Sequence, residues 1–226
     1  MIRPLGIVSQ HRLFGFLARK LADQLPSSGR VRLLDVGCGE RPYERLLRKL
    51  IDGPLRTLEY TGVDFYNAKA DAQVDLNRSE LPFGDASYDV ILSTEVLEHL
   101  HNPLFALGEM RRVLRPNGLL LLTTPFAFYV HEKEHDYYRY TYHLYRLWFA
   151  KDEILEEVIS NSILSFPLYA MYYALRFPSL GMISFLQKPL DWLALRFFGD
   201  RWHTYSCYMD SGFLVRINGS SATQPP

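Results

Sequence analysis

The chain has 226 residues, 48% of them hydrophobic, and its 25 lysines and arginines balance its 25 aspartates and glutamates. This size fits one large domain with a substantial core, and the zero net charge argues against a nucleic-acid partner, because such binding usually needs a basic excess. Two cysteines, Cys38 and Cys207, are too few for a disulfide framework and favour a reducing, cytoplasmic setting.

The first predicted element is an amphipathic helix from Gln10 to Leu25. Its leucines recur every four residues, which predicts one apolar face that covers a sheet or a cofactor: Leu13, Leu17, Leu21 and Leu25. Charged residues interrupt this N-terminal region early. It therefore lacks the apolar centre of a signal peptide.

A strand, a glycine turn and a helix follow, and they organise the rest of the chain. Val31–Val36 is predicted as the first strand from its mainly apolar residues, and Tyr43–Leu50 has a helical pattern. Between them Asp35, Gly37 and Gly39 form D-x-G-x-G. Such a unit begins a doubly wound α/β sheet, which binds ligands at the carboxyl ends of its strands. Glycine is needed there because a Cβ would collide with a ligand lying against the turn.

The turn lacks the features of a phosphate site. Pro42 stands where G-x-G-x-x-G has its third glycine, and no P-loop lysine follows. Asp35, ahead of the glycines, would repel phosphate but can accept hydrogen bonds. A ligand with a cation or an amine near the turn is favoured, and an ordinary strand–turn of an α/β protein is the alternative.

Two further strands carry acidic residues at or near their ends. Glu59–Asp64 is the second strand, and an acid at its end is placed to accept both hydroxyls of a ribose. Asp64 follows Gly39 by 25 residues, near the roughly 20 typical of such units. The alternative is a simple exposed strand end. Ala72–Leu76, which contains Asp75, is a short third strand.

A fourth strand begins near Tyr88, and a fifth is predicted at Leu119–Thr123. Between them, Asn102 followed by proline is typical of a helix start, so the main helix is expected at Pro103–Leu114. A turn at Arg115–Gly118 then leads into the fifth strand.

Five patterns between Leu33 and Pro125, in consistent order and spacing, together resemble the class I S-adenosylmethionine-dependent methyltransferases. They are D-V-G-C-G at 35–39, the acid ending the second strand, Asp75 with L-P-F-G-D-A-S-Y-D-V at 81–90, E-V-L-E-H-L at 95–100 and L-R-P-N-G at 114–118. The resemblance implies a Rossmann-like, doubly wound sheet of seven mostly parallel strands. Its last strand would be antiparallel and lie between the fifth and the sixth.

The same resemblance implies S-adenosylmethionine as the cofactor. Asp75 would accept a hydrogen bond from the adenine amino group and the backbone of Leu76 would contact the ring, although the spacing to Leu81 exceeds the commonest form. Residues after the fourth strand would line the cofactor on the acceptor side, with His99 as a further candidate. The expected cofactor site is Asp35, Gly37, Gly39, Asp64, Asp75, Leu76, Ser93 and Glu95.

Residues 131–135 spell H-E-x-x-H. On a helix, this spacing places two imidazoles on one face to bind zinc, with the glutamate as general base. A zinc-dependent hydrolase is therefore an alternative function, using His131, Glu132 and His135, with Glu153, Glu156 or Glu157 as a third ligand. The polar and aromatic residues that follow disfavour it, because a zinc-peptidase helix buries apolar residues. No metal site is expected.

The longer run His131–Thr141 resembles H-x-x-P-H-D-Y-Y-R-Y-T, a motif after the fifth strand of methyltransferases often linked to cell-surface saccharide or lipid pathways. Glu134 stands where those proteins usually have proline. Such side chains can orient a polar acceptor and take a proton from its hydroxyl. The expected acceptor pocket is His131, His135, Tyr138 and Arg139. Alternatively, the tyrosine and arginine side chains pack the loop onto the sheet.

A helix is predicted at Thr141–Lys151, a sixth strand at Glu153–Ile159 and a last strand at Phe213–Ile217. Between these strands lies an apolar insertion, 161–203, whose serines and prolines argue against a membrane span. It fits a helical lid over the acceptor, a membrane-surface patch for a lipid-linked acceptor, or a homodimer interface. Residues 218–226 have the composition of a disordered tail.

We therefore expect one domain over residues 1–217 that transfers a methyl group from S-adenosylmethionine. The acceptor is a small molecule, a saccharide or a lipid-linked compound, and oxygen is favoured as the acceptor atom through the family resemblance. A cytoplasmic enzyme is expected, with peripheral membrane contact through 161–203 left open. Besides the zinc hydrolase, a non-catalytic cofactor-binding scaffold is an alternative.

Overall fold

The computed structural model describes residues 3–4, 10–128, 130–131, 134–159 and 210–218. The insertion expected at 161–203, the Glu132 of H-E-x-x-H and the tail from residue 219 onward lie outside the described residues.

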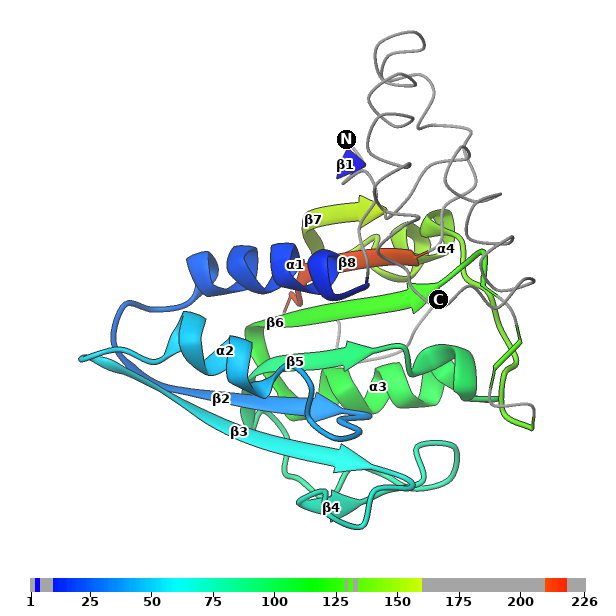
Figure 1. Cartoon of the computed structure of the whole chain (residues 1–226), viewed down its shortest axis with the longest axis horizontal. Helices are drawn as coiled ribbons and strands as arrows, with labels where there is room; N and C mark the ends of the chain where they lie inside the picture. Colours follow the sequence, from blue (N-terminus) through cyan, green and yellow to red (C-terminus); the bar gives the residue numbers. More distant parts are fainter. Residues whose placement is uncertain (1–2, 5–9, 129, 132–133, 160–209, 219–226) are drawn as a thin grey trace, which may run out of the picture.

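One mostly parallel sheet forms the centre of the molecule, in the order β1-β7-β8-β6-β5-β2-β3-β4 (Figure 1). The seven strands that the sequence predicts are all present, and β1 adds a two-residue strand beside β7. The strands are β1 (Arg3–Pro4), β2 (Gly29–Val36), β3 (Arg56–Asp64), β4 (Ala72–Gln73), β5 (Tyr88–Thr94), β6 (Leu114–Pro125), β7 (Glu153–Ile159) and β8 (Asp210–Arg216).

The last strand is antiparallel, as expected from the sequence. β8 pairs with β6 on one side and with β7 on the other. Its residues from Asp210 to Val215 are all buried, which fits the unbroken apolar stretch Phe213–Val215 within it. The predicted position between the fifth and sixth strands is confirmed.

Helices cover both faces of the sheet and create two separate cores. On one face, α1 (Gln10–Gln24) and α2 (Glu44–Ile51) pack against each other and against the strands (Figure 1). On the other face lie α3 (Pro103–Val113) and α4 (Tyr142–Trp148). The leucine face predicted for the first helix is buried, because Leu13, Leu17 and Leu21 are at most 1% exposed.

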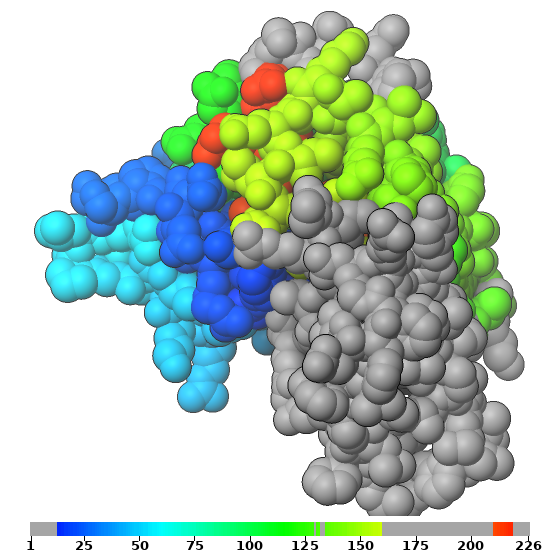
Figure 2. Space-filling model, turned by 90° about the horizontal axis from the view of Figure 1, so that it is seen from above, coloured from blue at the N-terminus to red at the C-terminus, as the bar shows by residue number. Residues whose placement is uncertain are grey.

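The first helix lies close to the end of the sheet that carries β7 and β8. In Figure 2, α1 borders the segment that ends in β7, and Lys20 reaches Glu156 of that strand at 3.5 Å. Gly212 of β8 allows this approach, because a Cβ there would stand 2.5 Å from Leu17 Cδ1.

Three local details differ from the sequence prediction or refine it. β4 stops at Gln73, so Asp75 and Leu76 follow the strand instead of belonging to it. The predicted turn at Arg115–Gly118 is a bulge inside β6: Tyr88 pairs with Leu114, but Val90 pairs with Leu119. Asn102 caps α3 as predicted, since its side chain accepts a hydrogen bond from the Phe105 amide.

In the part of the chain that the structure describes, we find no helix with the length and apolar character needed to cross a bilayer.

Candidate functional site

A cavity of about 500 Å³ opens at the carboxyl ends of the parallel strands. It lies where β2 pairs with β3 on one side and with β5 on the other, which is the position where the strand order of a doubly wound sheet reverses and ligands bind. Its walls come from the segments that follow β2, β3, β4 and β5, together with part of the loop between β6 and α4.

The glycine turn after β2 forms the floor of the cavity. Gly37 has φ +76°, and a Cβ there would lie 2.3 Å from a Val96 methyl group, so no other residue fits without displacement. Gly39 has φ +47° and its missing Cβ faces open space. Both glycines line the cavity, so the backbone at this turn is accessible to a ligand.

Asp64, the last residue of β3, connects the turn to the neighbouring loop. Its Oδ2 accepts a hydrogen bond from Gly39 N at 2.9 Å, and its Oδ1 accepts from the amides of Tyr66 and Asn67. These three bonds fix the carboxylate where it lines the cavity. Asp64 therefore has a structural part in shaping the turn besides any contact with a ligand.

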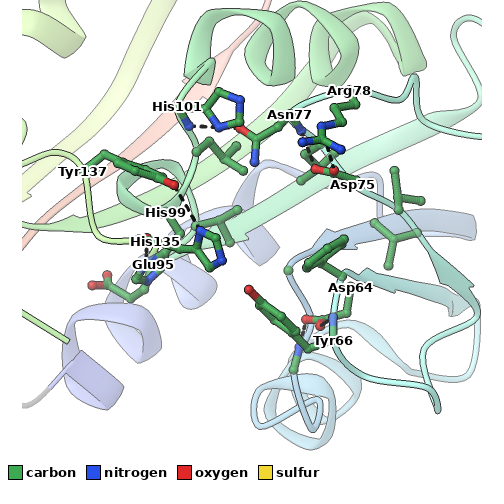
Figure 3. A pocket seen from close by; sticks show the side chains of 18 residues that line it. Asp64, Tyr66, Asp75, Asn77, Arg78, Glu95, His99, His101, His135 and Tyr137 are labelled. Atoms are coloured by element: carbon green, nitrogen blue, oxygen red, sulfur yellow. Dashed lines mark hydrogen bonds and ion pairs between the residues drawn. The ribbon is translucent and has the colours of Figure 1, made fainter. Parts of the chain in front are cut away.

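Asp75 and Leu76 lie on the same wall, after β4 (Figure 3). Asp75 Oδ1 accepts from Asn77 N at 3.0 Å, and Asn77 Oδ1 in turn accepts from His101 N at 2.9 Å. Leu76 contributes an apolar surface that is only 7% exposed. The wall thus combines acidic acceptors with an apolar patch.

The opposite wall carries histidine and tyrosine side chains. Figure 3 shows Glu95, His99, His135 and Tyr137 across the cavity from Asp64 and Asp75. His135 Nδ1 lies 3.0 Å from Tyr137 Oη. Glu95 is held in the left-handed region at φ +54°, and its Oε1 accepts from Thr123 Oγ1 at 2.8 Å. Strained non-glycine backbone of this kind is concentrated at functional sites.

Two residues expected at the cofactor are not among those that line the cavity. Asp35 is 1% exposed and receives a hydrogen bond from the Tyr60 hydroxyl. Burial raises the pKa of Asp35 to about 7. Ser93 is fully buried within β5. Both residues are therefore buried in the strands next to the cavity and do not form its surface.

Of the four residues expected in the acceptor pocket, His135 alone is among the described cavity-lining residues. Tyr138 is 40% exposed, and its hydroxyl lies 3.5 Å from the His101 carbonyl oxygen. Arg139 donates to both carboxylate oxygens of Asp136 and holds the pKa of that carboxyl at about 2. His131 lies near the same carboxylate, with 3.3 Å between its Nδ1 and Asp136 Oδ2.

The H-E-x-x-H run does not have zinc-peptidase geometry in the residues described. His131 and His135 lie in an irregular loop, not on a helix. The three glutamates considered as a third ligand lie on β7 and form ion pairs with other residues: Glu153 with Arg216, Glu156 with Lys20 and Glu157 with Arg146. The loop packs instead through Tyr140, whose hydroxyl donates to the Leu97 carbonyl oxygen at 2.8 Å.

Several lining residues were missed from the sequence: Phe65, Tyr66, Asn77, Arg78, His101 and Tyr137. Each lies within two residues of a predicted site residue, or directly after one of the motifs. The sequence signal for these residues is their position just after the end of a strand. This signal applies to every residue of such a loop, and not only to the acidic residue in it.

Glu98 is the most unusual titratable group near the site. It is 0% exposed, and burial, reinforced by the nearby Glu95 carboxylate, raises the pKa of Glu98 well above its ordinary value. The E-V-L-E-H-L pattern is visible in the sequence, but it does not single out Glu98 as a functional residue.

A protein family described as "Methyltransferase domain" has a sequence model that matches residues 9–161. A ubiquinone biosynthesis O-methyltransferase of Cereibacter sphaeroides is 34% identical over 121 residues, which are 47% of this chain and 45% of that protein. The 27-O-demethylrifamycin SV methyltransferase of Amycolatopsis mediterranei is 34% identical over 116 residues, 47% of this chain and 43% of that protein. These matches thus span less than half of either relative.

Solved structures share the fold. The [4+2]-cyclase SpnF superposes with a TM-score of 0.56 at 18% identity, covering 93% of this chain and 84% of that one. A phosphoethanolamine N-methyltransferase of Haemonchus contortus, solved with S-adenosylhomocysteine, has a TM-score of 0.53 at 16% identity and covers 91% and 52%. At these identities the likeness concerns the fold alone.

Proposed function

The chain belongs to the class I S-adenosylmethionine-dependent methyltransferase family, and from this premise we propose that it transfers a methyl group from S-adenosylmethionine to an oxygen atom of a small-molecule, saccharide or lipid-linked acceptor. One observation carries the proposal. The glycine turn, Asp64 and Asp75 surround a single cavity of about 500 Å³ at the point where the strand order reverses.

The residues present suit the cofactor. Carboxylates at Asp64 and Asp75 provide acceptors for ribose hydroxyls and an adenine amino group, and Leu76 provides an apolar surface for the ring. Gly39, whose missing Cβ faces open space, leaves room for the amino-acid part. When bound, S-adenosylmethionine supplies an electrophilic methyl group on a sulfonium.

Besides binding the cofactor, the protein must bind the acceptor and remove its proton. His135 and Tyr137 face the cavity opposite the proposed cofactor wall, so an acceptor hydroxyl between the walls would contact an imidazole that can take its proton. Alignment of two bound reactants can contribute about 7–11 kcal/mol without any further group. The names of the two curated relatives, one an O-methyltransferase and one acting on a demethylated oxygen site, support oxygen as the acceptor atom.

We also propose that residues 1–217 form one domain. The proposal is supported by β8, which completes the sheet between β6 and β7, so the described residues on either side of 160–209 belong to one sheet.

Ligand-induced stabilisation tests the cofactor assignment. S-adenosylhomocysteine at about 100 times its dissociation constant should add about 2.7 kcal/mol to the free energy of unfolding, which raises Tm by roughly 5–11 °C for a domain of this size. Asp64→Ala should remove most of this rise. Glu59→Ala, on the same strand but paired with Arg30 and Arg32 outside the cavity, is the matched control and should keep it.

A folded wild-type protein that shows no rise at saturating ligand would contradict the proposal. A rise without methyl transfer across a panel of phenolic, saccharide and lipid-linked acceptors would instead favour the non-catalytic scaffold. For the acceptor wall, His135→Ala should lower kcat, whereas Tyr138→Phe should leave it near wild type because Tyr138 does not line the cavity. Unchanged turnover in His135→Ala would remove that residue from the acceptor pocket.

A further inference from the structure

A buried carboxylate and two imidazoles form a compact cluster behind the histidine wall of the cavity. One ligand atom from each of Glu98, His99 and His131 lies within 4.8 Å of the others. We propose that these three side chains bind a divalent transition-metal ion. The cluster differs from the H-E-x-x-H pair, because it uses His131 with residues of the E-V-L-E-H-L segment and not with His135.

The state of Glu98 is the first argument. Its side chain is 0% exposed, and neither Oε1 nor Oε2 has a hydrogen-bond partner among the described residues. A buried carboxylate in this state is unfavourable unless a cation or a hydrogen-bond donor compensates it. His99 Nε2 lies 3.5 Å from Oε1, so the carboxylate points toward the cluster.

The orientation of the two imidazoles is the second argument. His99 Nδ1 lies 2.8 Å from the His135 carbonyl oxygen, and His131 Nδ1 lies 3.3 Å from Asp136 Oδ2. Metal-binding histidines commonly donate one ring N–H to a carbonyl or carboxylate, which fixes the tautomer and directs the other nitrogen to the metal. Both histidines would therefore bind through Nε2.

Asp136, the residue that accepts a contact from the His131 ring, is itself held in place. Asp136 also accepts from the His131 amide at 2.9 Å, and Arg139 donates to both of its carboxylate oxygens. The Asp136–Arg139 pair of the D-Y-Y-R motif thus has a specific part: it holds His131 against Glu98. This explains why the motif carries an ion pair at a position that does not line the cavity.

The distances between the ligand atoms of the three side chains are close to those of a metal site, so a small movement of the side chains would be enough to bind an ion. With metal–ligand bonds of about 2.0–2.2 Å, ligand atoms of a tetrahedral site lie about 3.3–3.6 Å apart. The Glu98–His99 distance of 3.5 Å already has this value. The three ligand atoms lie within 4.8 Å of one another, so side-chain shifts of roughly 1 Å would bring them to the separation of a tetrahedral site.

The ligand set indicates the class of ion. Two imidazoles and one carboxylate suit zinc, iron and related first-row ions, whereas magnesium and calcium prefer oxygen ligands throughout. Three protein ligands also leave coordination positions for other groups. Because His99 lines the cavity as well, an acceptor oxygen is the expected further ligand. That role rests on the proposed methyl transfer, but the metal site itself does not.

Spectroscopic titration of the full chain with Co²⁺ tests the site, because the visible absorption of Co²⁺ reports its ligands independently of any enzymatic activity. After treatment with a chelator, wild-type protein should bind one Co²⁺ with a visible band, and Zn²⁺ should displace it. Glu98→Gln and His131→Gln should each weaken binding by more than the roughly 10–100-fold expected for loss of an outer partner in Asp136→Asn. His131 is the second variant because its side chain is 25% exposed, so its replacement threatens folding less.

His135→Ala is the control, since His135 contributes only its backbone carbonyl to the cluster. Retained Co²⁺ binding in His135→Ala, with loss in the other two variants, supports the proposal. Loss in His135→Ala with retention in Glu98→Gln would assign the metal to H-E-x-x-H instead, and absence of a bound ion in folded wild type would overturn the proposal altogether. Thermal stabilisation by S-adenosylhomocysteine, measured on the same samples, separates failure of the metal site from failure of the proposed methyl transfer.

Discussion

Asp35 occupies an unfavourable position for a carboxylate. It lies on the middle strand of the parallel region, where side chains alternate between faces. Leu33 faces the core under α1 and α2, and Leu34 and Val36 face the other core. Asp35 therefore shares the α1/α2 face with Leu33, and this placement explains both its burial and its hydrogen bond with Tyr60.

The raised pKa of Asp35 predicts how stability changes with pH. Its pKa is 3.8 ordinarily and about 7 when folded, mainly through burial, with Tyr60 and Arg41 opposing and Asp64 and Glu44 reinforcing the shift. The protonated carboxyl is favoured in the folded state, so its contribution is fully present below about pH 4 and is lost as the pH rises to about 7. At 1.36 kcal/mol per pKa unit, this contribution is at most about 4 kcal/mol.

We expect Asp35→Asn to remove this part of the pH dependence. The amide cannot ionise but keeps an oxygen that can accept from Tyr60. Urea unfolding at several values between pH 4 and 8 should show the stability of the variant falling less with rising pH than that of wild type. Asp23→Asn, an exposed carboxylate on α1, controls for the change in net charge. Parallel profiles for wild type and Asp35→Asn would show that the folded protein does not disfavour the charged carboxylate.

At the scale of elements, Tyr140 provides a buried side-chain attachment for the loop between β6 and α4, beside the backbone bonds that Tyr137 and Tyr138 donate to the Glu98 carbonyl. Tyr140 is 3% exposed, stacks with Tyr138 and packs against Trp148. Its hydroxyl reaches the carbonyl oxygen of Leu97, next to Glu98 and His99. The loop and the E-V-L-E-H-L segment are therefore held together at the place where both contribute to the site.

Removing this hydroxyl should loosen the attachment. Tyr140→Phe removes one of two hydrogen bonds that the Leu97 carbonyl oxygen accepts, since the Leu100 amide also donates to it at 3.3 Å. We expect this loss to cost about 0.5–1.5 kcal/mol in the free energy of unfolding. Tyr138→Phe removes a weaker contact from a side chain that is 40% exposed and should change stability by less than about 0.5 kcal/mol. Chemical denaturation of the two variants beside wild type measures both values. Equal losses would show that the Tyr140 hydroxyl stabilises the loop no more than the Tyr138 hydroxyl does.

Sequence reasoning predicted the elements more fully than the site. The strands and helices followed from strong signals: leucines every four residues in α1, an asparagine–proline start at α3, and apolar runs ending at glycine or an acid. Membership of the cavity depends on which way each side chain points after a strand ends. Gly37, Gly39 and Asp64 line the cavity, but Asp35, two residues away in the same motif, does not.

The contacts of the loop could not be predicted from the sequence for a related reason. His131 and Glu98 are 33 positions apart and belong to segments that no local pattern connects. The H-E-x-x-H spelling suggested a helical pairing of His131 with His135, whereas the loop is irregular and Asp136 turns His131 toward Glu98. Local spacing is informative only within a regular element.

At the scale of the whole molecule, one cavity unites four segments that are distant in sequence. They lie at 37–39, 63–66, 74–78 and 95–101, with His135 and Tyr137 added from the later loop. A ligand bound here should therefore reduce local opening in all of these segments together.

Hydrogen exchange measured by mass spectrometry should show this pattern. With S-adenosylhomocysteine, peptides that contain the first four segments should exchange more slowly, and peptides of α2 and β7 should change little because they do not line the cavity. Slowing confined to the loop around residues 131–139 would place the ligand elsewhere.

The position of β8 has a further consequence for how the molecule is made. In the described sheet, β6 and β7 have no ladder with each other; each is joined to the other only through β8. A nascent chain that has emerged through residue 159 already contains every described segment that lines the cavity, yet its sheet is still divided between β6 and β7. The two parts of the sheet are joined only when β8, residues 210–216, has left the ribosome and pairs with both β6 and β7. The ligand pocket can therefore be assembled during synthesis before the sheet is complete, and final consolidation of the fold waits for the last strand to be translated.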